Sequence, residues 1–282
     1  MKASRGDIVT YVAERIETLY SKPERMRIAR QVAAALRGEA ESKFIIDPNE
    51  IIEIDIEQAA SELALGRPLQ YVTGKAEFCG EEFAVREGVL IPRPETEELV
   101  MWARDESRLF SSPRILDLCT GSGCIAISLK KLIPSAEVTA IDLSAEALAI
   151  ASENAERLNT EIRFIQDDVL RGCEMLKDEE FDIIVSNPPY IPQSERATMH
   201  INVTKYEPEM ALFVEDDDPL IFYREIARTA KRLLTKEGAL LFEIHEFLAE
   251  QTLQMLEQEG YKATLREDFL SKPRMICCHR KE

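Results

Sequence analysis

From about residue 113 onward, short apolar runs alternate with longer segments whose apolar residues have helical spacing. Short, partly β-branched apolar runs are typical of buried strands. We expect strands at Ile115–Leu118, Val138–Asp142, Ile162–Gln166, Phe181–Ser186, Ala239–Glu243, about 261–266 and Met275–His279, and helices at about 122–132, 145–158, 219–235 and 246–258. Asp218 followed by Pro219 predicts the cap of the third helix, and Gly238 is a candidate stop for it. The alternation predicts an α/β fold with a mainly parallel, doubly wound sheet.

The first 70 residues have helical patterns only, and they predict a small N-terminal helical bundle domain. Gly38 and Gly66 are expected to end helices, and Asp55 with Gln58 resembles a capping box at the start of another helix. No residue of this stretch points to chemistry, so we expect it to recognise the substrate.

Residues 71–92 change character, because glycines separate short apolar pieces in the way typical of a β-hairpin. A stiff loop, Pro92–Glu97, then leads into a helix. We therefore expect a recognition domain over residues 1–70, a hairpin linker over 71–92 and a catalytic domain over 93–282.

The chain is acidic, with 35 Lys and Arg against 52 Asp and Glu in 282 residues and a net charge of −17. A broad nucleic-acid footprint normally needs a basic surface, so we expect no direct nucleic-acid partner, although a local basic patch stays open. The six cysteines form no C-x-x-C pair and no His cluster accompanies them, which predicts reduced thiols and no metal site. The N-terminus lacks a signal-peptide core, and no apolar run approaches the roughly 20 residues that span a bilayer. We expect a cytoplasmic monomer without a membrane partner.

The run Phe181–Ser186 ends in Asn187, Pro188, Pro189 and Tyr190. Open α/β sheets place their ligands at the carboxyl ends of strands. Proline fixes its own φ and restricts the residue before it, so the carbonyl oxygens of Asn187 and Pro188 become fixed acceptors beside the flat ring of Tyr190. Two acceptors and a ring suit a planar –NH2 group, whose lone pair they could aim at an electrophile. A rigid turn that leaves a strand is the alternative interpretation of the same four residues.

A second candidate site follows the strand at Ile115–Leu118. That strand leads into a glycine turn and then a helix, where the backbone can approach a ligand closely. The candidate cofactor-binding residues here are Asp117, Cys119, Thr120, Gly121, Ser122 and Gly123.

Acidic residues end the next two strands. Asp142 could hydrogen-bond both ribose hydroxyls of a nucleoside, and Asp168, followed by Val169, could reach an adenine amino group. The glycine turn departs from the full dinucleotide pattern, and Asp117 suits a cationic ligand better than a pyrophosphate. These points favour S-adenosylmethionine as the cofactor, with Asn187 also close to it.

Together these segments resemble the HemK-type protein-(glutamine-N5) methyltransferases, and within them the peptide chain release factor methyltransferases. The resemblance covers nearly the whole chain and rests on Arg67–Gly74, Val89–Glu97, Asp117–Gly123, Asn187–Tyr190 and Tyr206–Leu212. It implies a class I (Rossmann-like) S-adenosylmethionine-dependent methyltransferase domain and an N-terminal helical domain that helps to dock the release factor. It also implies that Asn187–Tyr190 holds the glutamine of the Gly-Gly-Gln loop of peptide chain release factors.

Two residues depart from the family pattern: Cys119 replaces a usual glycine, and Val169 stands where some relatives have an aromatic residue. The basic segment Lys272–Arg274 approximates a family segment without an assigned role. Three alternatives stay open. A sister enzyme modifies a ribosomal protein with the same tetrapeptide, DNA adenine-N6 methyltransferases share it, and a non-catalytic module that binds translation factors is the third.

Overall fold

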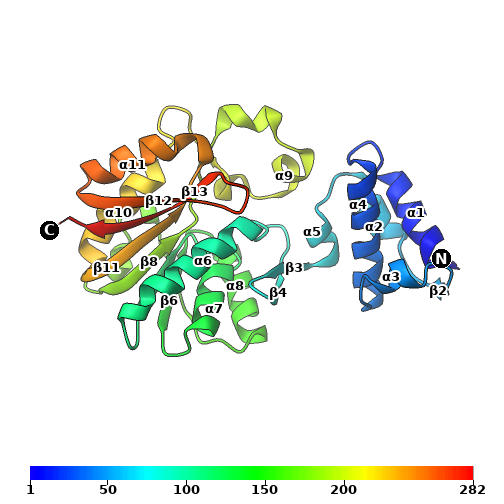
Figure 1. The fold of residues 1–282 in the computed structure, drawn as a ribbon, viewed down its shortest axis with the longest axis horizontal. Coiled ribbons are helices and arrows are strands. Elements are labelled where there is room, and N and C mark those ends of the chain that lie inside the picture. Colours follow the sequence, from blue (N-terminus) through cyan, green and yellow to red (C-terminus); the bar gives the residue numbers. More distant parts are fainter. Residues whose placement is uncertain (282) are drawn as a thin grey trace. The chain divides into compact units, whose positions relative to one another are not determined.

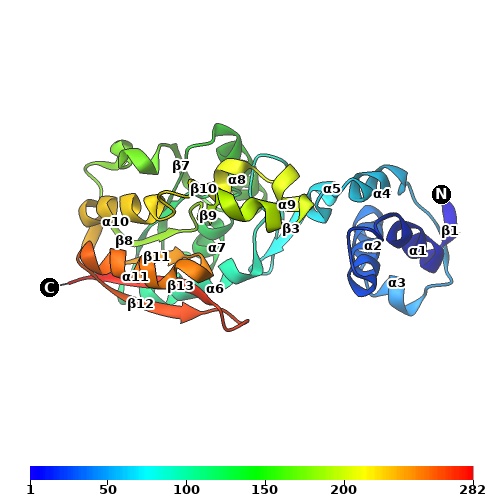
Figure 2. The ribbon, with the colours of Figure 1, turned by 90° about the horizontal axis from the view of Figure 1, so that it is seen from above.

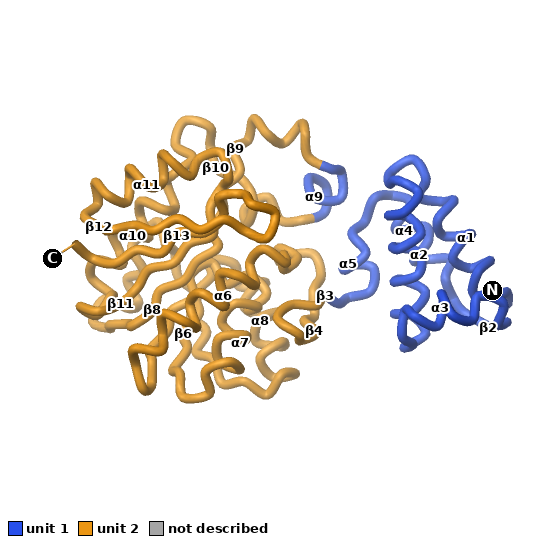
Figure 3. The backbone as a smooth tube through the Cα atoms, viewed as in Figure 1, with its two compact units in different colours: residues 1–75, 200–206 blue, residues 76–199, 207–282 orange. Residues whose placement is uncertain are grey.

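The computed structural model describes residues 1–281, and the chain divides into two compact units (Figure 3). Unit 1 consists of Met1–Lys75 and His200–Tyr206, and unit 2 consists of Ala76–Met199 and the chain from Glu207 onward. The chain therefore passes between the units three times. The return of residues 200–206 to unit 1 was not anticipated from the sequence.

Unit 1 is mainly helical, but the expectation of helices alone is wrong. Its helices are α1 (Arg5–Arg15), α2 (Lys22–Arg37), α3 (Lys43–Ile46), α4 (Glu57–Ala64), α5 (Leu69–Thr73) and α9 (Ile201–Tyr206). Two strands, β1 (Lys2–Ser4) and β2 (Ile51–Glu53), pair antiparallel. Each strand has only three residues, which is too short for a periodic signal in the sequence.

Of the helix ends predicted in unit 1, the one at Gly38 is confirmed and the capping box at Asp55 and Gln58 is wrong. Gly38 caps α2 with a left-handed φ of 62°. The predicted capping box is absent, because Ile56 occupies the N-cap of α4 and makes no side-chain cap bond. The Gln58 amide donates instead to Glu62 at 2.9 Å, one turn further along the helix.

Unit 2 contains a seven-stranded sheet in the order β12-β13-β11-β8-β5-β6-β7. Its strands are β5 (Arg114–Leu118), β6 (Glu137–Asp142), β7 (Arg163–Gln166), β8 (Phe181–Ser186), β11 (Leu234–Glu243), β12 (Tyr261–Glu267) and β13 (Pro273–Arg280). Neighbours from β11 to β7 pair in parallel, and β13 runs antiparallel to both β11 and β12. The mainly parallel sheet predicted from the sequence is thus confirmed.

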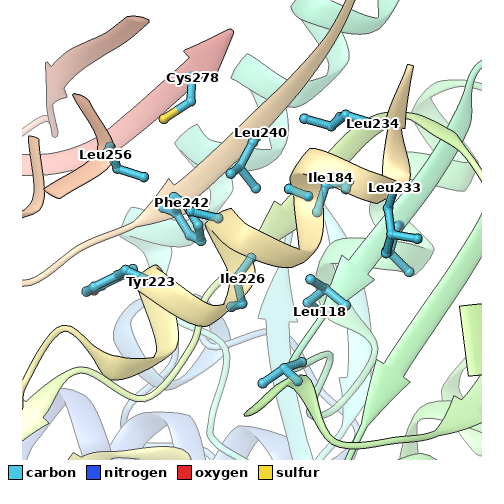
Figure 4. Close-up of a cluster of buried hydrophobic side chains, with 14 of the residues drawn as sticks. Leu118, Ile184, Tyr223, Ile226, Leu233, Leu234, Leu240, Phe242, Leu256 and Cys278 are labelled. Atoms are coloured by element: carbon cyan, nitrogen blue, oxygen red, sulfur yellow. The ribbon is translucent and has the colours of Figure 1, made fainter. Parts of the chain in front are cut away.

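Helices cover both faces of this sheet (Figures 1 and 2). They are α6 (Pro94–Glu106), α7 (Cys124–Leu132), α8 (Ala145–Arg157), α10 (Ile221–Leu233) and α11 (Ala249–Gln258). The alternation of β5 shows the two layers, because Leu116 and Leu118 belong to one buried cluster and Ile115 to the other. The first cluster includes Tyr223 and Ile226 of α10 (Figure 4).

Two expectations around α10 are wrong. The helix begins at Ile221 after the N-cap Leu220, and the Asp218 carboxylate pairs with Arg224 at 2.6 Å instead of capping. Gly238 lies inside β11 and does not stop the helix, which ends at Leu233. A Cβ at Gly238 would lie 2.9 Å from the Asp182 carbonyl oxygen on the neighbouring strand. A close approach of two backbones therefore explains this glycine.

The hairpin predicted within residues 71–92 is present as β3 (Lys75–Phe78) and β4 (Glu81–Ala84), whereas residues 71–73 belong to α5. Cys79 and Gly80 join the strands with φ values of 49° and 77°, which is the backbone of a two-residue turn with a positive φ at both positions. A short parallel pair, β9 (Ile191–Pro192) and β10 (Phe213–Val214), completes the strands. No helix of the described chain is long and apolar enough to cross a membrane.

Candidate active site

A pocket lies at the carboxyl ends of the parallel strands of unit 2, where α/β sheets bind their ligands. It holds about 810 Å³ of space, counting the solvent at its mouth. Its lining residues come from strand ends and the loops that follow: Gly88, Val89, Leu90, Cys119, Gly121, Asp142, Leu143, Ser144, Ala147, Asp167, Asp168, Val169, Leu170, Asn187, Pro189, Pro208, Met210, Ala211 and Phe222. The pocket therefore brings together seven of the candidate site residues named from the sequence, namely Cys119, Gly121, Asp142, Asp168, Val169, Asn187 and Pro189.

The glycine turn after β5 leaves room for a ligand at one position and packs tightly at another. Gly121 has a φ of 55°, and a Cβ there would meet no atom within 4 Å. Gly123 has a φ of 81°, and a Cβ there would lie 3.1 Å from the Ala151 Cβ. Cys119 also has a positive φ, of 64°. That conformation favours glycine and is uncommon for a side-chain-bearing residue, so the structure gives a physical reason for a glycine at this position.

The Asp142 carboxylate is fixed by two backbone groups at the edge of the pocket. Its Oδ2 accepts a hydrogen bond from the Gly121 N–H at 2.8 Å, and its Oδ1 accepts one from the Ser144 N–H at 2.9 Å. Burial raises the pKa of this carboxyl, although these backbone bonds oppose the shift. Each oxygen keeps a further lone pair, so Asp142 can accept from two hydroxyls of a ligand.

Asp117 is fully buried and does not line the pocket. Its Oδ2 accepts from the Thr120 hydroxyl at 2.6 Å and from the Ala126 N–H at 3.2 Å, while its Oδ1 has no partner among the described residues. Burial raises the pKa of this carboxyl to about 7. Thr120, Ser122 and Gly123 also lie outside the lining. The predicted cofactor contacts of these four residues stay predictions.

Asp168 and Val169 follow the third strand, β7, in a short 3-10 turn at the pocket wall. The Asp168 side chain caps a short 3-10 turn by accepting from the Leu170 N–H at 2.9 Å. Val169 is buried against the core beside it. Asp167 lines the same wall, and its Oδ1 accepts from the Asp168 N–H at 2.7 Å.

The tetrapeptide after β8 places Asn187 and Pro189 on the pocket. The Asn187 Nδ2 donates to the Thr96 hydroxyl oxygen at 3.3 Å, and its Oδ1 accepts no hydrogen bond from residues 1–281. The Tyr190 hydroxyl donates to Glu243 Oε1 at 3.0 Å. Pro188 is not part of the lining.

Sequence reasoning missed Thr96 and Glu243. Thr96 lies in the first turn of α6, and Glu243 is the last residue of β11. Both are 2% exposed, and the Thr96 hydroxyl donates to Glu243 Oε2 at 2.5 Å. The signal that could have found Glu243 is a carboxylate at the carboxyl end of a buried parallel strand, the same position that drew attention to Asp142.

Glu207 joins two of the segments on which the family resemblance rests. Its buried carboxylate accepts from the Ile91 N–H at 3.1 Å and from the Arg93 guanidinium at 2.6 Å. The Leu212 carbonyl in turn accepts from the Tyr190 N–H at 3.2 Å. The segment around Glu207 thus ties the α6 loop and the tetrapeptide into one wall of the pocket.

Among the described residues, Glu106, Cys277 and His279 bring potential metal-ligand atoms within 4.8 Å of one another, outside the pocket lining. Cys277 and His279 are two residues apart on β13 and therefore lie on the same face of that strand, whereas Glu106 is the last residue of α6. Because Glu106 is distant in the sequence, no local motif indicates this group. All six cysteines are free thiols.

A family model and solved structures identify the class of protein to which this chain is similar. Residues 101–205 match the family model of the methyltransferase small domain. A solved methyltransferase of Pyrococcus furiosus is 17% identical with a TM-score of 0.53, covering 81% of this chain and 100% of that one. A ribosomal protein L11 methylase of Lactobacillus delbrueckii subsp. bulgaricus is 21% identical with a TM-score of 0.50, covering 70% of this chain and 84% of that one. The fold is that of a class I methyltransferase.

Sequence relatives then define the family. A release factor glutamine methyltransferase of Flavobacterium psychrophilum is 49% identical over 214 residues, which is 74% of each chain. One of Bacteroides thetaiotaomicron is 38% identical over 278 residues, covering 97% of this chain and 99% of that protein. The chain belongs to the release factor glutamine methyltransferase family.

Proposed function

We propose that this chain transfers a methyl group from S-adenosylmethionine to the side-chain amide nitrogen of the glutamine in the Gly-Gly-Gln motif of peptide chain release factors. The family assignment supports the enzyme class, and the site supports the chemistry. We also propose that residues 1–70 help to dock the release factor on a catalytic region over residues 93–282, with residues 71–92 as the linker.

The pocket fits the cofactor by the chemistry of its residues. The fixed Asp142 carboxylate can accept from ribose hydroxyls, and the open space at Gly121 lets a ligand approach the backbone. Asp168 and Val169 line the wall where an adenine would lie. The Oδ1 of Asp117 has no partner behind the turn, and a cationic ligand nearby would favour the ionised form of this carboxyl. When bound, S-adenosylmethionine supplies an electrophilic methyl group on a positively charged sulfur.

The free oxygen of Asn187 is the observation that carries the proposal. Its Nδ2 is committed to Thr96, which leaves Oδ1 as an acceptor at a residue that lines the pocket. Together with the Pro188 carbonyl oxygen, it can hold both hydrogens of a glutamine amide. An amide nitrogen is a poor nucleophile because its lone pair is delocalised. Two fixed acceptors favour the pyramidal nitrogen that forms during attack, so they act mainly in the transition state.

Turnover of purified release factor with labelled S-adenosylmethionine tests the proposal, with ribosomes and DNA as competing substrates. We expect label on the release factor, and we expect this label to be lost when the glutamine of its Gly-Gly-Gln motif is replaced.

The Asn187→Ala change should lower turnover by about 10²-fold or more, by analogy with the loss of one positioned transition-state hydrogen-bonding group. Cofactor affinity should change less. Asn187→Asp keeps an acceptor of similar size and should retain some activity. Near-normal turnover of Asn187→Ala at saturating release factor would refute the mechanism, and label on ribosomes or DNA alone would refute the substrate.

A further inference from the structure

The side-chain amide of Asn187 has two ends that differ in function, because only its oxygen can accept hydrogens from a substrate amide. A rotation of half a turn about the last side-chain bond would place an N–H2 group where the acceptor is needed. No backbone group fixes this choice among residues 1–281, and the one side-chain partner of Asn187 is Thr96. The orientation of the amide therefore depends on what the Thr96 hydroxyl can offer.

A threonine hydroxyl has a single proton to donate. Thr96 donates that proton to Glu243 Oε2 at 2.5 Å, so its oxygen has only lone pairs left for Asn187. An oxygen with lone pairs alone attracts the Nδ2 end of the amide and repels the Oδ1 end. The observed Nδ2 to Oγ1 distance of 3.3 Å agrees with this arrangement.

The Glu243 carboxylate directs the proton of Thr96. Its second oxygen accepts from the Tyr190 hydroxyl at 3.0 Å, so both oxygens receive a hydrogen bond. Burial raises the pKa of Glu243, and the bonds from Thr96 and Tyr190 together with the charge of Arg274 oppose that shift in favour of the acceptor form. Glu243 thus holds Tyr190 directly and Asn187 through Thr96.

We propose that Glu243 and Thr96 are positioning residues that orient the Asn187 amide so that its oxygen faces the substrate amide. This inference rests on the proposed function, since it assigns a direction to the same catalytic side chain. Thr96 does not itself line the pocket; it acts through its hydrogen bond with Asn187, which does.

A double-mutant cycle between Thr96 and Asn187 tests the inference. Thr96→Val keeps the shape of the side chain but removes the acceptor, so we expect turnover to fall by about 10-fold or more with an unchanged dissociation constant for S-adenosylmethionine. Thr96→Ser keeps both hydrogen bonds and should restore most of the turnover. In the Asn187→Ala background, Thr96→Val should change turnover by less than about 2-fold, because the residue through which it acts is gone.

Thr235→Val is a matched control. Thr235 lies on β11, the same strand as Glu243, but outside the pocket, and its hydroxyl donates to the Asp182 carboxylate at 3.1 Å. It should leave turnover unchanged. Normal turnover of Thr96→Val, or an equal loss in both Asn187 backgrounds, would overturn the positioning role while leaving the Asn187 result, and thus the proposed function, intact. If Thr96→Val does not fold, Thr96→Ala enters the same cycle, since it introduces no atoms that could clash.

Discussion

The buried carboxyl of Asp117 should make the stability of the protein depend on pH. Asp117 is fully buried, and burial raises its pKa from 3.8 to about 7, with Asp142 adding to the shift and the bonds from Thr120 and Ala126 opposing it. In the unfolded chain the same group releases its proton near pH 4. Between these two values the folded state binds more protons than the unfolded state, so the free energy of unfolding falls as pH rises.

The size of this effect follows from the same two values. Each pH unit in which only the folded state holds the proton contributes about 1.4 kcal/mol, so the interval from pH 5 to pH 7 amounts to about 3 kcal/mol. Asp117→Asn removes the titration and keeps an oxygen to accept from Thr120 and Ala126. Its amide nitrogen replaces the partnerless Oδ1, at a constant cost of about 1–3 kcal/mol.

The measurement is urea unfolding of both proteins at several pH values from 5 to 8. The titrating groups that do not interact with Asp117 cancel in the difference between the two curves. We expect Asp117→Asn to gain about 3 kcal/mol relative to the original protein as pH rises from 5 to 8, and to change little above pH 8. A difference that stays constant across this range would show that Asp117 is ionised throughout, and the reasoning from burial would be wrong.

Three further outcomes are expected. Asp142→Ala should weaken S-adenosylmethionine binding by about 1–3 kcal/mol, the cost of leaving ligand hydroxyls unpaired, and unchanged affinity in a calorimetric titration would contradict the ribose contact. Gly88→Ala should destabilise the protein by about 1–3 kcal/mol, because Gly88 has a φ of 108° that L residues rarely adopt, and the exposed Glu146 side chain would also have to move away from the new Cβ. Gly260→Ala, with a φ of 85° and no atom within 4 Å, should cost less in the same unfolding assay. A fragment that begins near Arg93 should fail to fold, because it lacks the hairpin whose phenylalanines are buried in the sheet core. A longer fragment that begins at Ala76, the start of unit 2, should bind the cofactor but lose most activity on intact release factor. Full activity of that longer fragment would exclude the docking role.

Elements with a long apolar pattern could be predicted from the sequence, and features set by one particular partner residue could not. Phe181–Ser186 was predicted residue for residue, because a continuous apolar run ends in a rigid tetrapeptide. The cap at Asp218 was predicted wrongly, since Arg224 competes for its carboxylate. Similarly, the strand β11 begins five residues before the expected Ala239, in a polar stretch that pairs irregularly with β8.

The candidate site shows the same division. Strand-end acids such as Asp142 and Asp168 line the pocket as their positions suggested. Thr96 and Glu243 are 147 residues apart, and nothing local to either residue indicates that one donates to the other. At Cys119 the family resemblance indicated that a glycine is usual, but the physical reason, a φ of 64°, comes only from the structure.

The divided sequence of unit 1 has a consequence for how the protein is made. Its last piece, His200–Tyr206, stacks His200 on Tyr20 with ring centroids 5.2 Å apart, and the Tyr206 hydroxyl donates to the Leu65 carbonyl at 3.0 Å. The 124 residues of Ala76–Met199 separate the two pieces, which corresponds to roughly 6–25 s of synthesis. During that interval the helices near the N-terminus have already left the ribosome with the Tyr20 ring and the Leu65 carbonyl still uncovered. The first unit to be translated is therefore completed only after most of the second has been made.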